Sequence, residues 1–187
     1  MFYARATEVI RMVGPSMLPT LNRKAADSAA ESELLVMRRL RTPDSVARGD
    51  VVAFTHPLQL AEDSLLVRRV LGVPGDVLAD EETELQLQEG QCWVVADNEA
   101  LRPPHVEDSR SFGPLTLRDI QGRVIYAIRT PTDHGPVEGS AESAAADAPL
   151  LDVEVGDILA DPELFSEAAA EAPMDAPAEG APDKQAG

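Results

Sequence analysis

The sequence predicts a mainly β domain followed by a long acidic segment. Five short runs rich in Val, Ile and Leu, separated by turn residues, indicate strands. No stretch before residue 137 spaces its apolar residues as an amphipathic helix does. Together these observations favour a folded sheet or barrel of short strands. The expected strands are residues 34–41, 50–55, 65–73, 91–96 and 122–129.

The segments between these strands carry the residues of turns and surface loops. Gly, Pro and Asp gather at residues 48–50, 74–76 and 112–114, where we predict tight turns. Two polar insertions, residues 22–33 and 80–90, are interpreted as surface loops. Each predicted strand is therefore short and bounded by polar chain.

The composition changes near residue 136. Residues 138–187 contain 13 acidic residues and one lysine, and residues 166–187 contain no aromatic or β-branched residue. We therefore predict a folded domain over residues 1–135 and a mostly disordered acidic tail over residues 136–187. An apolar run at 150–165 either docks on the body or a partner, or belongs to a weakly ordered linker.

Composition also excludes several classes of function. The net charge is −17, and neither part of the chain is basic, so we expect no nucleic-acid partner. A single cysteine, Cys92, allows no internal disulfide or zinc cluster, and we expect it to be buried. We expect no metal or cofactor. No run of about 18 apolar residues is present, and residues 1–11 are too short for a signal peptide.

Candidate chemistry begins with Ser16 in the stretch GPSMLPTL. Turn residues on both sides would present its hydroxyl as a nucleophile, although this stretch alone is weak evidence. Three further segments follow in order: RGDVVAF at 48–54, VRRVLGVPGD at 67–76, and ADNEALRPPHVEDSRSFGPLTLRDIQGRV at 96–124. The four segments together form a specific pattern.

This pattern resembles the type I signal peptidase family, peptidase S26, and within it the mitochondrial inner membrane protease subunits. The resemblance covers about residues 11–130. It implies a β-rich catalytic domain and a serine endopeptidase that cuts targeting peptides after small residues. It also implies a place at the mitochondrial inner membrane and a paralogous protease subunit as partner. Membrane association would come through that partner or through an N-terminal anchor that this chain lacks.

The resemblance implies a Ser–Lys dyad, in which Ser16 aligns with the nucleophile and Arg68 stands at the position of the general-base lysine. Lysine can take the serine proton when burial lowers its pKa. A guanidinium stays protonated and has no lone pair to offer. The two lysines of the chain, Lys24 in a polar insertion and Lys184 near the end, are not expected to replace it.

A second departure concerns the residue that orients the base. Relatives carry a serine two positions before the Asp of the Asp-Ser-Arg motif, and here that position is Val106. The three histidines, at positions 56, 105 and 134, are interpreted as surface or turn residues.

Other residues of the motifs are expected to support the site. By resemblance, Gly14 occupies the place of an oxyanion-stabilising hydroxyl of bacterial relatives, and Met17 flanks the nucleophile. The backbone N–H of Ser16 remains as an oxyanion donor. The residues expected to hold the loops behind the site are Asp97, Asn98, Asp108 and Arg110.

Two interpretations of function stay open. One is a serine endopeptidase that processes presequences. The other is a non-catalytic subunit that stabilises an active paralogue or presents substrate to it. The loss of both the base and its orienting hydroxyl favours the second. A self-cleaving repressor-type domain shares the Ser–Lys chemistry, but it needs the same lysine and a helical DNA-reading segment before Ser16.

Overall fold

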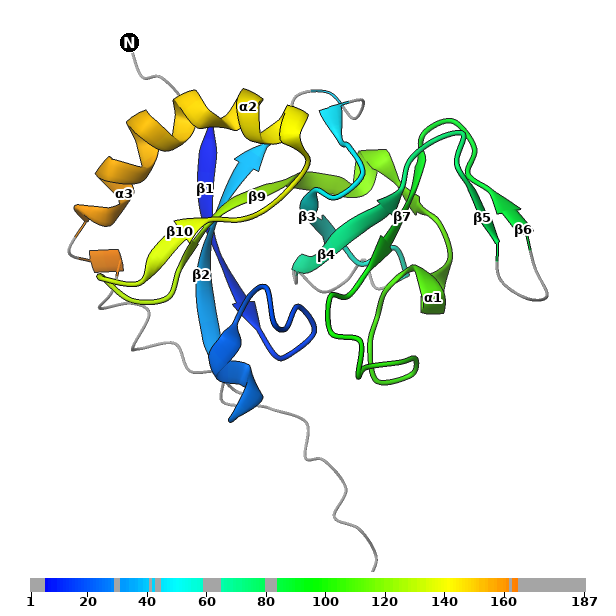
Figure 1. Cartoon of the computed structure of the whole chain (residues 1–187), viewed down its shortest axis with the longest axis horizontal. Coiled ribbons are helices and arrows are strands. Elements are labelled where there is room, and N and C mark those ends of the chain that lie inside the picture. The colour runs from blue at the N-terminus through cyan, green and yellow to red at the C-terminus, as the bar shows by residue number, and fades with distance from the viewer. Residues whose placement is uncertain are drawn as a thin grey trace, which may run out of the picture.

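The computed structural model of the protein describes residues 6–164, except 29–30, 41, 43–44, 59–64, 80–83 and 162. The fold is mainly β, as predicted, and is built on one eight-stranded antiparallel sheet (Figure 1). Its order is β1 (Thr7–Val13), β2 (Ser32–Arg39), β9 (Ile120–Ile128), β3 (Val51–Thr55), β4 (Leu65–Gly72), β7 (Gln91–Val95) and β8 (Leu115–Thr116), with β10 (His134–Pro136) also paired to β9. A separate hairpin of β5 (Val77–Ala79) and β6 (Glu84–Gln86) projects from the body.

The five predicted strands are confirmed as β2, β3, β4, β7 and β9. Cys92, on β7, is buried as expected, and burial raises the pKa of its thiol to about 12. Strand β1 was not predicted, because its sequence TEVIRMV mixes charged and apolar residues within seven positions. It forms by pairing with β2, with Val9 opposite Val36, and it buries Ile10 and Met12.

Strand β9 organises the sheet because it pairs with β2, β3 and β10. Register shifts at Val36/Met37 and Ala53/Phe54 interrupt its two main pairings, and such bulges bend a sheet. Strands β9 and β2 approach closely at Gly122, where an added Cβ would lie 2.5 Å from the carbonyl oxygen of Arg38. Only glycine therefore fits at this point of β9.

The helical elements are short. They are η1 (Arg23–Ala26), α1 (Ser109–Phe112), η3 (Leu117–Asp119), α2 (Ala141–Leu150), the π-helical turn η4 (Leu151–Val155) and α3 (Gly156–Leu159). Among the described residues, no helix combines the length and the apolar character that crossing a membrane requires.

The first part of the acidic segment differs from the expected disordered tail. Residues 141–159 are helical, because Ser140 caps α2 through its side chain and the helices find partners on the body. Ile158 packs with Val36, Ile125 and Ile128, so the apolar run docks on the body, which was one of the two predicted outcomes. Residues 165–187 lie outside the described residues.

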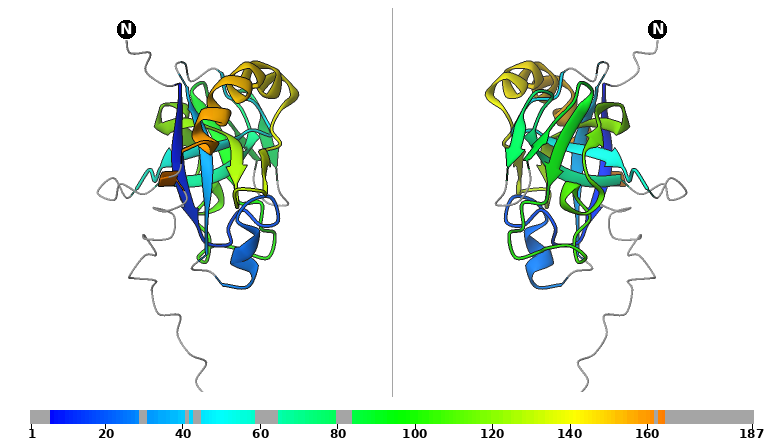
Figure 2. Two further views of the ribbon diagram at one scale, coloured as in Figure 1. Left: turned by 90° about the vertical axis from the view of Figure 1, so that its left-hand side faces the viewer. Right: turned by 90° about the vertical axis from the view of Figure 1, so that its right-hand side faces the viewer.

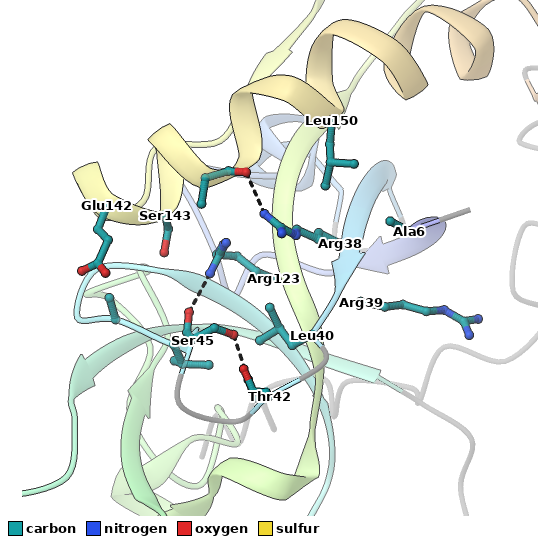
Figure 3. Close-up of a pocket in the computed structure, with 13 residues that line it drawn as sticks. Ala6, Arg38, Arg39, Leu40, Thr42, Ser45, Arg123, Glu142, Ser143 and Leu150 are labelled. Carbon is teal, nitrogen blue, oxygen red and sulfur yellow. Dashed lines mark hydrogen bonds between the residues drawn. The ribbon is translucent and has the colours of Figure 1, made fainter. Parts of the chain in front are cut away.

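Helix α2 is also held by buried charge. Asp147 forms ion pairs with Arg38 and Arg123, and the Arg123 Nε lies 2.7 Å from the Asp147 Oδ2. Figure 3 shows Arg38 reaching up to the backbone of α2 and Arg123 donating to Ser45, around a cavity of about 480 Å³. Its lining includes Ala6 just before β1 and Arg38 and Arg39 at the end of β2. This end of the two strands is opposite to η1 (Figures 1 and 2).

Candidate active site

The loop that carries Ser16 follows β1 directly. Strand β1 ends at Val13, and Gly14 then takes a φ of +85°, a conformation that favours glycine and turns the chain away from the sheet. The backbone N–H of Leu18 donates to the carbonyl of Pro15 at 3.1 Å, which closes a turn around the serine. Ser16 sits on this turn with its side chain half-buried.

Met17 anchors the loop in the core. Its side chain is fully buried and packs in the cluster that contains Met12, Leu21, Leu35 and Met37. Truncating a buried methionine of this kind typically costs about 2–5 kcal/mol. The position of the Ser16 hydroxyl therefore depends on the apolar residue that follows it, and Gly14 and Met17 both serve the shape of the loop.

Arg68 reaches Ser16 from strand β4. The Arg68 Nη1 donates to the Ser16 Oγ at 3.0 Å, although 52 positions separate the two residues in the chain. The Arg68 Nε donates to the carbonyl of Glu107 at 2.8 Å, and Nη1 also donates to the carbonyl of Val67 at 2.7 Å. The residue is only 5% exposed. The structure thus brings the predicted nucleophile and the residue at the predicted base position into direct contact.

Burial changes the acidity of Arg68 but not its role near neutral pH. Desolvation lowers its pKa to about 10, against the opposing effect of the nearby Asp108 and Glu107 charges. At pH 8 roughly 1% of the guanidinium would be neutral. The hydrogen bond runs from Arg68 to Ser16, whereas a general base has to accept the serine proton.

The other candidate bases lie elsewhere. Lys24 is exposed on η1, and Lys184 lies outside the described residues. His105 is exposed, and His134 bonds Tyr126 at 2.8 Å. His56 was interpreted as a surface or turn residue, and this was wrong.

The His56 side chain is buried, with its ring edge-on to Phe112. Its Nδ1 accepts from the backbone of Leu58 at 3.1 Å, and its Nε2 lies 3.7 Å from a carboxylate oxygen of Glu107. Its two ring nitrogens therefore face Leu58 and Glu107, and not the serine hydroxyl.

Val106 is buried, one residue before Glu107, whose carbonyl holds Arg68. A serine at this position would place a hydroxyl in the chain segment that contacts the base. Valine offers only methyl groups, and the arginine instead donates to the backbone carbonyls of Glu107 and Val67 as well as to Ser16.

Asp97 and Asn98 hold the Ser16 loop through hydrogen bonds. The backbone N–H of Asn98 donates to the carbonyl of Ser16 at 3.0 Å, and its side-chain amide donates to the carbonyl of Pro15 at 2.9 Å. Asp97 accepts from the hydroxyl of Thr20 at 2.6 Å. It also accepts two hydrogen bonds from Arg69, at 2.8 and 2.7 Å, so the pair is bidentate.

Asp108 and Arg110 form a second bidentate pair. Asp108 is fully buried, caps α1, and accepts from the side chain and the backbone N–H of Arg110 and from the backbone N–H of Ala96. Burial by itself would raise the pKa of Asp108, but these hydrogen bonds lower it overall. The hydrogen bond from Ala96 to Asp108 fixes the residue that precedes Asp97. The Asp108–Arg110 pair therefore supports the Asp97–Arg69 pair.

Comparison with known proteins identifies the family. The family model for signal peptidase, peptidase S26, matches residues 2–89, which include Ser16 and Arg68. Mitochondrial ATP-independent inner membrane protease subunit 2 of Arabidopsis thaliana is 38% identical over 160 residues, which are 83% of this chain and 74% of the relative. The chain belongs to the signal peptidase family, peptidase S26.

Further relatives of this S26 family member have similar names. Mitochondrial inner membrane protease subunit 1 of Schizosaccharomyces pombe is 34% identical, over 62% of this chain and 69% of the relative. Mitochondrial inner membrane protease subunit 2 of Danio rerio is 28% identical, over 73% of this chain and 72% of the relative. The solved structure of a signal peptidase I from Enterococcus faecalis matches with a TM-score of 0.32 and 19% identity, over 43% of this chain and 97% of that one.

One part of the site of this S26 family member was not predicted. Asn22 lies in the insertion interpreted as a surface loop, yet it is buried in a left-handed conformation with φ 50°. Its side-chain amide donates to the carbonyls of Gly14 at 3.0 Å and Glu31 at 2.7 Å. Its backbone N–H donates to the buried carboxylate of Glu33, which lies 3.4 Å from Arg129. Asn tolerates left-handed backbone, and this was the available sequence signal.

We expect Glu33→Gln to change how stability depends on pH. Burial raises the pKa of Glu33 above its ordinary value, against the opposing effects of the Asn22 N–H and Arg129. A raised pKa contributes stability that is present below the ordinary value and is lost as pH rises through the folded-state value. Glutamine keeps the acceptor for Asn22 without this loss. The melting temperature of the variant minus that of wild type should therefore increase between about pH 4 and pH 8. A constant difference would contradict a raised pKa.

Proposed function

We propose that the protein is a non-catalytic subunit of a mitochondrial inner membrane protease, which binds targeting peptides for an active paralogous subunit. The hydrogen bond from the Arg68 Nη1 to the Ser16 Oγ carries this proposal. In a Ser–Lys dyad the amine accepts the serine proton, and the serine oxygen then attacks the peptide carbonyl. Here the contact exists, but the side chain opposite the serine is a donor.

Three further features support a site without catalytic activity. The carbonyls of Glu107 and Val67 accept hydrogen bonds from the Arg68 guanidinium and fix its position beside Ser16. Val106 supplies no hydroxyl that would orient an amine. Lys24 lies on η1, where its side chain is exposed to solvent.

The residues that hold the loops around the serine nevertheless keep their contacts. The pairs Asp97–Arg69 and Asp108–Arg110 hold the segments around the serine, and Asn98 holds its loop. A chain that has lost the base but keeps the shape of the site fits a role in binding. The names of the relatives support the mitochondrial inner membrane as its location and a second protease subunit as its partner.

The second candidate is an active serine endopeptidase of the presequence-processing type. It is favoured by the lowered pKa of Arg68, because a small neutral fraction of the guanidine exists below pH 10. If neutral Arg68 were the base, cleavage would rise about tenfold per pH unit up to about pH 10 and would level off above it.

A cleavage assay with a presequence peptide separates the two candidates. We expect the wild type and Ser16→Ala to be indistinguishable between pH 7 and pH 9, because the serine has no base. Product formation would be followed by mass spectrometry, with an active S26 peptidase as positive control. Cleavage that Ser16→Ala abolishes, and that rises with pH as described, would instead establish the endopeptidase.

A further inference from the structure

The arginine leaves two hydrogen-bond donors on Ser16. Since the Ser16 Oγ accepts the N–H of Arg68, its own hydroxyl proton is free to point toward another acceptor. No described residue accepts a hydrogen bond from the backbone N–H of Ser16. The residue is half-buried, so it is not sealed off from a ligand. The serine therefore offers an O–H and an N–H to a ligand.

The charge behind these donors is positive, and no carboxylate among the described residues forms an ion pair with it. Arg68 donates to two neutral carbonyls and a hydroxyl, and within the described chain it pairs with no carboxylate. Other buried or half-buried arginines do pair with a carboxylate, for example Arg69 with Asp97 and Arg123 with Asp147. The charges of Asp108 and Glu107 also act on Arg68, but Asp108 is already bonded to Arg110 and a Glu107 carboxylate oxygen lies 3.7 Å from His56.

An anion with two acceptor atoms matches this arrangement. A carboxylate accepts from the O–H and the N–H at once, and hydrogen bonds to an ionised acceptor are roughly twice as strong as neutral ones. The buried guanidinium 3.0 Å behind the Ser16 Oγ adds attraction in a setting that water screens weakly. An uncharged amine at the same position would not provide this attraction.

We propose that Ser16 and Arg68 form a receptor for the C-terminal carboxylate of a peptide. This inference rests on the proposed function, in which the site binds targeting peptides. In a serine peptidase site the carbonyl carbon of the scissile bond lies at the serine oxygen. Hydrolysis of that bond leaves a carboxylate at the end of the N-terminal fragment, at the same place. The reaction that supplies this ligand is thus peptide-bond hydrolysis by an active subunit.

The test compares two forms of one fluorescently labelled presequence-type peptide ending in Ala. One form has a free C-terminal carboxylate and the other a C-terminal amide, and binding to the full chain is measured by fluorescence anisotropy. We expect the acid to bind at least about tenfold more tightly than the amide. Ser16→Ala and Arg68→Gln should each reduce this preference to about twofold or less. Acetate at high concentration should compete with the acid but not with the amide.

The matched control is Arg118→Gln, which removes an exposed positive charge and should keep the full preference for the acid. Thermal unfolding shows whether Arg68→Gln is folded, and Ser16→Ala carries the test if it is not. Equal binding of acid and amide by the wild type would overturn the proposal, as would a preference that survives in Ser16→Ala.

These outcomes are independent of the cleavage assay. The acid peptide ends at the position where cleavage would occur, so its binding is measured whether or not the chain cleaves longer peptides. Cleavage by the wild type with a preference for the acid would sink the proposed function and keep the receptor. No cleavage and no preference would sink the receptor alone.

Discussion

Replacing Asp147 with alanine is expected to lower the free energy of unfolding by about 3–5 kcal/mol, because it leaves buried arginine charge without its partner. Asp147 is 4% exposed and lies between Arg38 and Arg123. Of its ion pairs within the described residues, Arg123 would keep only the longer one, at 3.4 Å to Asp50, which already accepts from Ser143 at 2.7 Å. The removed carboxylate also anchors α2 to β2 and β9, so the helix loses its main polar attachment.

Thermal and urea unfolding would measure this loss. For a chain of this length, 3–5 kcal/mol corresponds to a fall of about 10 °C in the melting temperature. Glu142→Ala is the control, since it removes an exposed carboxylate from the first turn of the same helix and should cost about 0.3–1 kcal/mol. A loss for Asp147→Ala no larger than that of the control would show that apolar contacts alone dock the helix.

The double variant Arg68→Lys/Val106→Ser is expected to gain Ser16-dependent cleavage of presequence peptides. A lysine at position 68 would lie in the same buried environment that lowers the pKa of the arginine, so part of it would be neutral near pH 8. A positioned general base contributes about 10²–10⁴-fold to rate. The serine at position 106 orients the amine, so Arg68→Lys alone should gain less than the pair.

Two controls make this gain specific. Adding Ser16→Ala to the double variant should abolish the activity, because the nucleophile is then absent. Arg69→Lys changes the neighbouring arginine of β4, whose partner is Asp97 and not Ser16, and it should gain no activity. No activity in a correctly folded double variant would mean that more than the base has been lost from the site.

Much of the fold was predictable because strand patterns are local. Short apolar runs between turn residues mark β2, β3, β4, β7 and β9 within one or two residues of their ends. Strand β1 is different, because its mixed sequence becomes a strand only against β2. Helix α2 likewise has a composition that suggests disorder, and it is stabilised by Arg38 and Arg123, which lie far away in the chain.

The sequence by itself determined the family motifs, the prediction of Ser16 as the nucleophile and the absence of a lysine at position 68. Residue types are local facts, and the chemistry of a guanidinium follows from its structure alone. Only the tertiary structure decided that Arg68 contacts Ser16. It also decided that Asn22 and Glu33, in the segment 22–33 predicted as a surface loop, are buried and hold the Ser16 loop. These facts depend on the pairing of distant strands and on burial. Pairing sets which side chains meet, and burial sets which hydrogen bonds must be satisfied inside the protein.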